Sequence, residues 1–96
     1  MPKYVIERDF PGAGNLSHKE LQEISIKSCD VLKGMDTAKI QWLESYVTDD
    51  KIYCIYIAEN EALLKQHAQG GGFPITKVSR VNEVIDPATS EVLTHA

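Results

Sequence analysis

The stretch that decides the fold is QWLESYVTDDKIYCIYIA, Gln41 to Ala58. It belongs to two alternating, aromatic-rich segments, Ile40 to Thr48 and Lys51 to Ala58, which are joined at Asp49-Asp50. Alternation of side-chain type with a period of two is typical of β-strands, and Asp tolerates turn geometry. The stretch therefore predicts a β-hairpin in the middle of the chain.

A two-residue turn fixes the register of this hairpin and divides its side chains between two faces. One face is predicted to carry Leu43, Ser45, Val47, Ile52, Cys54 and Tyr56. The other face is predicted to carry Trp42, Glu44, Tyr46, Tyr53, Ile55 and Ile57. Both faces are largely apolar, so each needs a cover. Helices can cover one face, and we expect a second copy of the chain to cover the other, as a homodimer through the sheet face.

A helix is predicted before the hairpin, over residues 18–33. Ser17 is placed to be its N-cap, and Glu20 completes a capping box three residues later. Gly34 is placed to end the helix in the left-handed conformation. Helical spacing puts one set of side chains on a common face: Leu21, Ile24, Ser28, Cys29 and Leu32.

The remaining segments complete the pattern. Lys3 to Arg8 and Val78 to Asp86 are predicted strands, and Asn60 is placed to cap a second helix that the run Gly70 to Gly72 ends. The order β-α-β-β-α-β predicts an α+β protein, a ferredoxin-like sandwich whose four-stranded antiparallel sheet has both helices on one face. We expect a single domain over residues 1–96, with a core at about 3–86 and a C-terminal tail at 87–96.

The composition limits the classes of function. A chain of 96 residues is long enough for one domain, and 43% hydrophobic with 25% charged residues is ordinary for a globular protein. The net charge of −4 and the scattered basic residues argue against nucleic-acid binding. No segment is long and apolar enough to span a bilayer, and the N-terminus has no apolar signal-peptide core, so a cytoplasmic location is expected.

Three of the four candidate metal ligands are His67, Cys29 and Cys54, and the fourth is Glu44. His67 lies on the apolar face of the second helix, where it is either a half-buried histidine packed against the sheet or a metal ligand. Cys29 and Cys54 both lie on predicted core faces, where a free cysteine behaves as a small hydrophobe. If the three shared one layer, two thiolates and an imidazole would suit a soft or borderline divalent metal. The other histidines, His18 and His95, lie in a first helical turn and in the tail.

Glu44 is the most unusual polar residue of the hairpin, because it stands in mid-strand between Trp42 and Tyr46. It is either a rim residue open to water, a metal ligand, or a general base with a raised pKa. Tyr46 and Tyr53, which are cross-strand neighbours in the predicted register, are candidate pocket residues beside it. No catalytic residue is assigned, since no Ser-His-Asp ordering and no nucleophile signature is present.

A combination of motifs resembles a known family. The motifs are FPGAG (Phe10 to Gly14), SCDVL (Ser28 to Leu32), QW-x-x-SYVTDDKIYCIYIA (Gln41 to Ala58), HAQGGGFP (His67 to Pro74) and VIDP-x-T (Val84 to Thr89). Together they resemble the small bacterial nickel-binding proteins of a widespread domain family first labelled as of unknown function. The similarity covers nearly the whole chain.

This resemblance implies a ferredoxin-like fold, a homodimer, and cytosolic nickel binding linked to metal tolerance or scavenging, with no established enzyme activity. His67, Cys29 and Cys54 match the family, whereas Glu44 stands where the family more often has His. An oxygen donor is harder than imidazole and would weaken nickel binding or change the preferred metal. The first hypothesis is thus a non-enzymatic binder of nickel or another divalent transition metal.

Two alternatives stay open. One is small-ligand binding, or an enzymatic dimer, with a pocket between the helices and the sheet that Glu44, Tyr46 and Tyr53 would line. The other is an interaction module without a small ligand.

Overall fold

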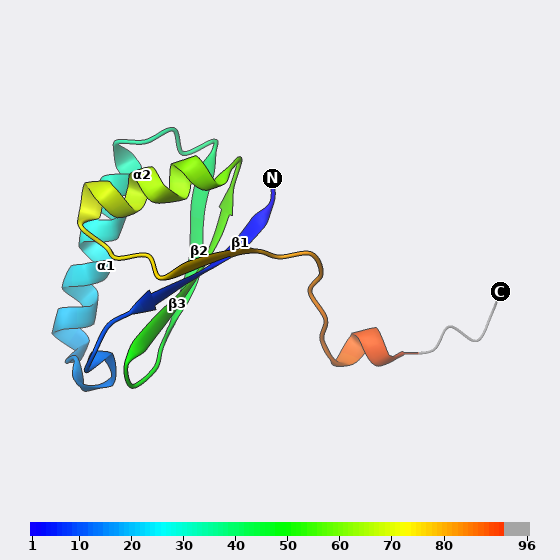
Figure 1. The fold of residues 1–96 in the computed structure, drawn as a ribbon, viewed down its shortest axis with the longest axis horizontal. Coiled ribbons are helices and arrows are strands. Elements are labelled where there is room, and N and C mark those ends of the chain that lie inside the picture. Colours follow the sequence, from blue (N-terminus) through cyan, green and yellow to red (C-terminus); the bar gives the residue numbers. More distant parts are fainter. Residues whose placement is uncertain (92–96) are drawn as a thin grey trace.

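One antiparallel sheet, covered on one side by two helices, forms the body of the protein (Figure 1). The computed structural model describes residues 1–91. The elements are β1 (Lys3–Asp9), α1 (His18–Lys33), β2 (Ile40–Val47), β3 (Lys51–Ala58), α2 (Glu61–Gly71) and β4 (Lys77–Arg80), with 3-10 turns η1 (Ala13–Asn15) and η2 (Pro87–Ser90). The four strands lie in the order β2-β3-β1-β4. This arrangement confirms the predicted ferredoxin-like α+β fold.

The start of α1 follows the sequence signal, but its end does not. Ser17 and Glu20 form the predicted capping box. Gly34, however, has φ −83° and is right-handed, because its N–H continues the helical turn by donating to the Val31 carbonyl at 3.1 Å. The left-handed cap predicted there occurs instead at Gly72, with φ 68°, at the end of α2.

The hairpin has the predicted register near its turn and a different one farther away. Tyr46 pairs with Tyr53, as expected, but a β-bulge lies between Trp42 and Glu44. A bulge inserts one extra residue and so reverses the faces of the residues beyond it. Trp42 therefore pairs with Tyr56 on the helix-covered side, and Leu43 is 45% exposed. The faces predicted for Trp42 and Leu43 are wrong for this reason.

The last strand is shorter than predicted because its partner runs out. β1 begins at Lys3, whose carbonyl accepts the final ladder bond from Val81 N at 2.8 Å. Residues 81–86 have no strand beside them and lead away from the sheet towards η2, as the right of Figure 1 shows. Within the tail expected over 87–96, residues 87–90 form η2, whereas residues 92–96, including His95, lie outside the described part of the chain.

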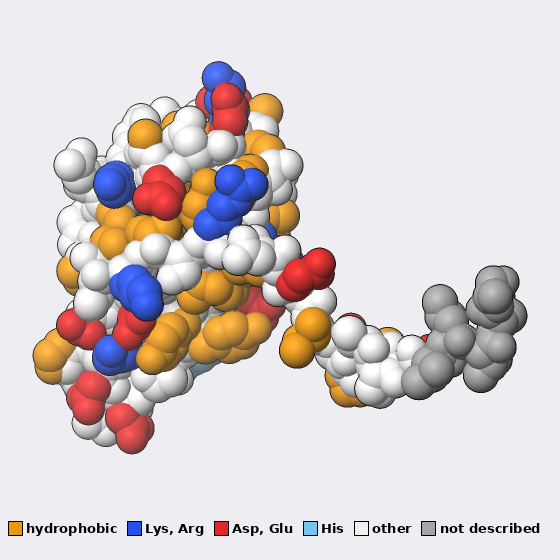
Figure 2. Space-filling view, turned by 45° about the vertical axis from the view of Figure 1, so that its right-hand side comes forward, with side chains coloured by type: hydrophobic (Ala, Val, Ile, Leu, Met, Phe, Trp, Pro, Cys, Tyr) orange, Lys and Arg blue, Asp and Glu red, His pale blue; other side chains and the backbone are white. Residues whose placement is uncertain are grey.

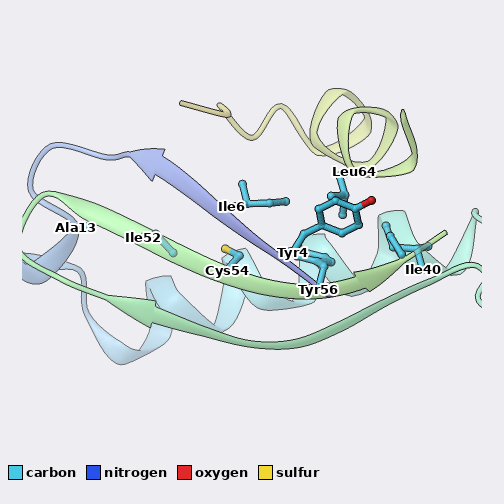
Figure 3. Packing of buried hydrophobic residues seen from close by; sticks show 9 residues of the cluster. Tyr4, Ile6, Ala13, Ile40, Ile52, Cys54, Tyr56 and Leu64 are labelled. Carbon is cyan, nitrogen blue, oxygen red and sulfur yellow. The ribbon is translucent and has the colours of Figure 1, made fainter. Parts of the chain in front are cut away.

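The hydrophobic core is densest between α2 and the sheet. Figure 3 shows side chains from the strands gathering beneath the Leu64 side chain of α2. The large apolar side chains buried there include Tyr4, Ile6, Ile40, Tyr56 and Leu64, all at most 4% exposed. Burial of each such side chain contributes about 1.5–3 kcal/mol. This half of the molecule is the main source of its stability.

The other side of the sheet has no cover within residues 1–91. Figure 2 turns this side towards the viewer and shows hydrophobic side chains gathered between charged ones. The half-buried apolar residues Val5, Ile55 and Ile57 lie here, and Tyr46 on the same side is 52% exposed. Among the described residues, no helix is long and apolar enough to cross a membrane.

Candidate functional site

A cavity of about 390 Å³ lies between α1 and the sheet. It exists because α1 packs loosely: of its 16 residues only Ser28 is fully buried, whereas α2 buries four of its 11. Leu21 and Ile24 of α1 form one wall and are only half-buried. The sheet supplies Trp42, Ile52 and Cys54, and the segment after α2 supplies Phe73. Most of the lining is therefore apolar.

Arg8 brings a positive charge to this cavity. It follows Tyr4 and Ile6 at two-residue spacing on the helix-covered side of β1, and only 5% of it is exposed. Its Nη1 donates to the Pro74 carbonyl at 2.9 Å, and its guanidinium carbon lies 5.6 Å from the centre of the Phe73 ring. None of the ion pairs among the described residues involves Arg8. The guanidinium is thus hydrogen-bonded and stacked, but no carboxylate balances its charge.

His67 lies beside the cavity, in the wall between α2 and the sheet. It is 1% exposed, and its ring centre is 5.5 Å from the ring centres of both Tyr56 and Phe73. Its Nε2 shares a hydrogen bond of 3.1 Å with the Ser28 hydroxyl, while Nδ1 is the buried side-chain nitrogen without a partner among the described residues.

The electrostatics of this group keep the imidazole neutral. Burial lowers the pKa of His67, the backbone of Ser28 opposes that shift by hydrogen bonding, and the charge of Arg8 adds to it. Burial likewise raises the pKa of Tyr56, with Arg8 and Ser28 acting in the opposite direction. At pH 7 we therefore expect a neutral histidine and a neutral tyrosine next to a permanent cation.

The structure separates the predicted metal ligands. Cys54 is buried on the helix-covered side of β3, as expected, but Cys29 is exposed. Its predicted core placement is wrong, because the preceding residue, Ser28, is the one that α1 turns inward. Glu44 pairs with Ile55 on the uncovered face. Within residues 1–91 no three or more His, Cys, Asp or Glu side chains gather as a metal site.

The predicted pocket residues lie away from the cavity. Tyr46 and Tyr53 are cross-strand neighbours, as predicted, and both share the uncovered face with Glu44. The Glu44 carboxylate raises the pKa of Tyr46, mainly by hydrogen bonding and to a smaller extent by its negative charge. Glu44 and Tyr46 are both exposed to solvent, so their contact is a surface interaction.

Sequence reasoning missed the residues that define the cavity, above all Arg8. One signal was available: alternation along β1 places Arg8 on the same face as Tyr4 and Ile6, so a buried arginine follows from the strand pattern. Lys27 of α1 also lines the cavity, and neither it nor Phe73 left such a signal, because their positions depend on how α1 and the segment after α2 pack.

Fold and cavity together define a small ferredoxin-like α+β protein with a cationic, largely apolar cavity under its first helix. The chain belongs to the family described as "Nickel responsive protein SCO4226-like", whose model matches residues 4–81. The family resemblance seen in the motifs is thereby confirmed.

One solved structure has a similar fold. The fold is similar to the crystal structure of SCO4226 from Streptomyces coelicolor A3(2), with a TM-score of 0.68 and 14% sequence identity, over 86% of this chain and 99% of that chain. At this identity the likeness shows the fold alone. No curated protein sequence matches the chain significantly.

Proposed function

We propose that this chain is a cytosolic protein of a bacterial nickel response that binds nickel directly and is not an enzyme. The observation that carries the proposal is the family match over residues 4–81, since the family is described as nickel responsive. Nickel is the cargo in this account. Binding would serve metal tolerance or scavenging.

His67 is the protein donor that we propose first. Neutral imidazole is the commonest metal ligand, and burial keeps this ring neutral. Its Nδ1 has no hydrogen-bond partner among the described residues, so its lone pair is free in the tautomer whose Nε2–H donates to the Ser28 hydroxyl. Cys54 is buried on the same side of the sheet. Two such donors do not complete a nickel site, so water or a second copy of the chain would supply the rest.

Arg8 limits how tightly a cation binds near His67. Its charge contributes to the lowered pKa of the imidazole, so it acts on that ring electrostatically. The same charge repels a divalent ion, so we expect only moderate affinity for Ni²⁺ at this position.

Calorimetric titration of untagged protein with Ni²⁺ tests the proposal. We expect saturable binding that a His67→Ala substitution weakens at least about tenfold, the usual scale for losing a strong polar interaction. His18→Ala, on the exposed first turn of α1, is the matched control and should bind as the natural chain does. Absence of binding contradicts direct nickel binding, and equal binding by the His67 variant contradicts the choice of donor.

We also propose that the uncovered face of the sheet forms a homodimer. The support is its row of half-buried apolar side chains, among them Ile55 near the middle of β3. Ile55→Lys should therefore convert a dimer to a monomer in sedimentation experiments, because a charge at an apolar interface is costly to desolvate. Ile26→Lys, at a 54% exposed position on α1, should leave the protein a dimer in the same sedimentation experiment. A monomeric natural chain contradicts this proposal.

A further inference from the structure

We propose that the cavity between α1 and the sheet binds a small carboxylate with an apolar body, and that Arg8 holds its carboxylate group. This ligand site shares the lining residue Cys54 with the nickel proposal, but it is argued from other residues and requires no metal. It gives a specific form to the idea of a small-ligand pocket between the helices and the sheet, with residues other than those expected from the sequence.

Within the described part of the chain, Arg8 carries an unbalanced positive charge. A buried cation costs free energy unless an anion and hydrogen bonds compensate for its lost hydration. Arg8 is 5% exposed, yet the acidic partners of the four ion pairs among residues 1–91, Glu7, Asp9, Asp30 and Glu59, all pair with lysines. The Pro74 carbonyl accepts from only one of its nitrogens. A bound anion would supply the missing counter-charge.

The size and lining of the cavity suit a small ligand that is mostly apolar. Its volume of about 390 Å³ falls within the ~300–1,000 Å³ that is common for small-molecule sites. Leu21, Ile24, Trp42, Ile52 and Phe73 give it apolar walls. A fully polar anion would not use these walls. The lining therefore favours a ligand with one anionic head and an apolar body.

Two cationic side chains lie near the Phe73 ring at the cavity. The Lys27 ammonium lies 5.7 Å from the centre of the Phe73 ring, and the Arg8 guanidinium lies 5.6 Å from it. Arg8 is buried while Lys27 is exposed, so Arg8 is placed to bind the anion and Lys27 to attract it. A single buried guanidinium matches the single charge of a carboxylate, whose planar oxygens its fork can engage.

Metal-free titration with matched probes tests this site. The probes are 4-phenylbutanoate and octanoate, each compared with its neutral amide, in buffer containing a chelator. Trp42 is the one tryptophan of the chain and lines the cavity, so its fluorescence reports occupancy alongside calorimetry. At least one carboxylate should bind saturably and at least about tenfold more tightly than its amide. No saturable binding, or equal binding of acid and amide, overturns the proposal.

Substitution of Arg8 separates a ligand-binding role from a structural one. Arg8→Met should weaken carboxylate binding at least about tenfold, while the melting temperature of the ligand-free protein stays the same or rises, because an unbalanced buried charge is removed. Arg80→Met, at the exposed end of β4, is the matched control and should change neither property. A folded Arg8→Met protein that still binds the carboxylate as the natural chain does would falsify the assignment.

A second variant keeps the test decisive if Arg8→Met does not fold. Lys27→Glu changes an exposed residue and should leave the fold intact. It should weaken carboxylate binding by about threefold or more, and added salt should reduce the difference, because the interaction is a screened charge attraction. Unchanged affinity in this variant contradicts the proposal that Lys27 attracts the carboxylate to Arg8.

Discussion

The helix-covered side of the sheet has two halves that are packed very differently. Under α2, Leu64 is fully buried against the strands, and the core there is dense. Under α1, Leu21 and Ile24 remain half-buried, and a cavity of about 390 Å³ separates the helix from the sheet. α1 is the longer helix, with 16 residues against 11, so length does not explain the difference.

The two halves of the covered side therefore use their apolar surface differently. The α2 half uses its apolar area for stability, and cavities there would be costly. The α1 half leaves apolar area uncovered and keeps a buried charge, Arg8, at its edge. Both features lower stability, which is expected of a binding site and not of a core.

The largest expected effect comes from truncating one helix residue in each half. Leu64→Ala should lower the free energy of unfolding by about 2–5 kcal/mol, as for a fully buried leucine. Ile24→Ala should cost about 1 kcal/mol or less, because its side chain already borders the cavity. Urea denaturation followed by circular dichroism measures both. Equal losses would mean that the two halves are packed alike.

The boundary between the halves provides the next test. A Cβ atom at Gly71 would overlap the Phe73 ring, which borders both His67 and the cavity. Gly71→Ala should therefore cost about 1–3 kcal/mol, as overpacking does. Gly34→Ala is the control, because the Gly34 φ of −83° suits alanine and the nearest atom to the added Cβ, the Val31 carbonyl oxygen, is 3.5 Å away. The free energy of unfolding of this variant should rise by about 0.4–1 kcal/mol. Thermal melts of the two variants should move in opposite directions.

The smallest effect is a pH dependence that originates at His67. Its folded pKa lies below the ordinary value of 6.5, chiefly through burial, so the unfolded chain binds more protons as the pH falls below about 6.5. Stability should therefore decline from there towards the folded pKa, by at most about 1.4 kcal/mol per pH unit for one proton. In His67→Gln this component should be absent, whereas His18→Gln should retain it. An unchanged pH slope in His67→Gln contradicts the burial argument.

Local rules were enough to predict much of the fold. Ser17 and Glu20 cap α1 as their spacing requires, and the hairpin turn sets the pairing of Tyr46 with Tyr53. These signals depend on residues close together in the sequence. The order of elements then restricts the topology to one familiar pattern.

The features that sequence did not reveal depend on distant residues. Residues 81–86 have strand-like composition, but they lack a partner because β1 begins at Lys3. No turn residue at Leu43 indicates the bulge in the sequence. The bulge places Trp42 on the cavity side of the sheet. Of the candidate site, sequence identified the buried positions of His67 and Cys54, while Arg8 gained its importance only from the gap that α1 leaves.

The most direct test of the division between the halves is a map of amide NMR shifts as octanoate is added to metal-free protein. Large changes should fall on the cavity-lining parts of α1, on the lining residues Ser45, Val47, Ile52 and Cys54, and on Gly71 to Pro74, while the packed positions Ile40 and Leu64 change little. Changes centred on the uncovered sheet face, or shared evenly by both halves, would contradict the account.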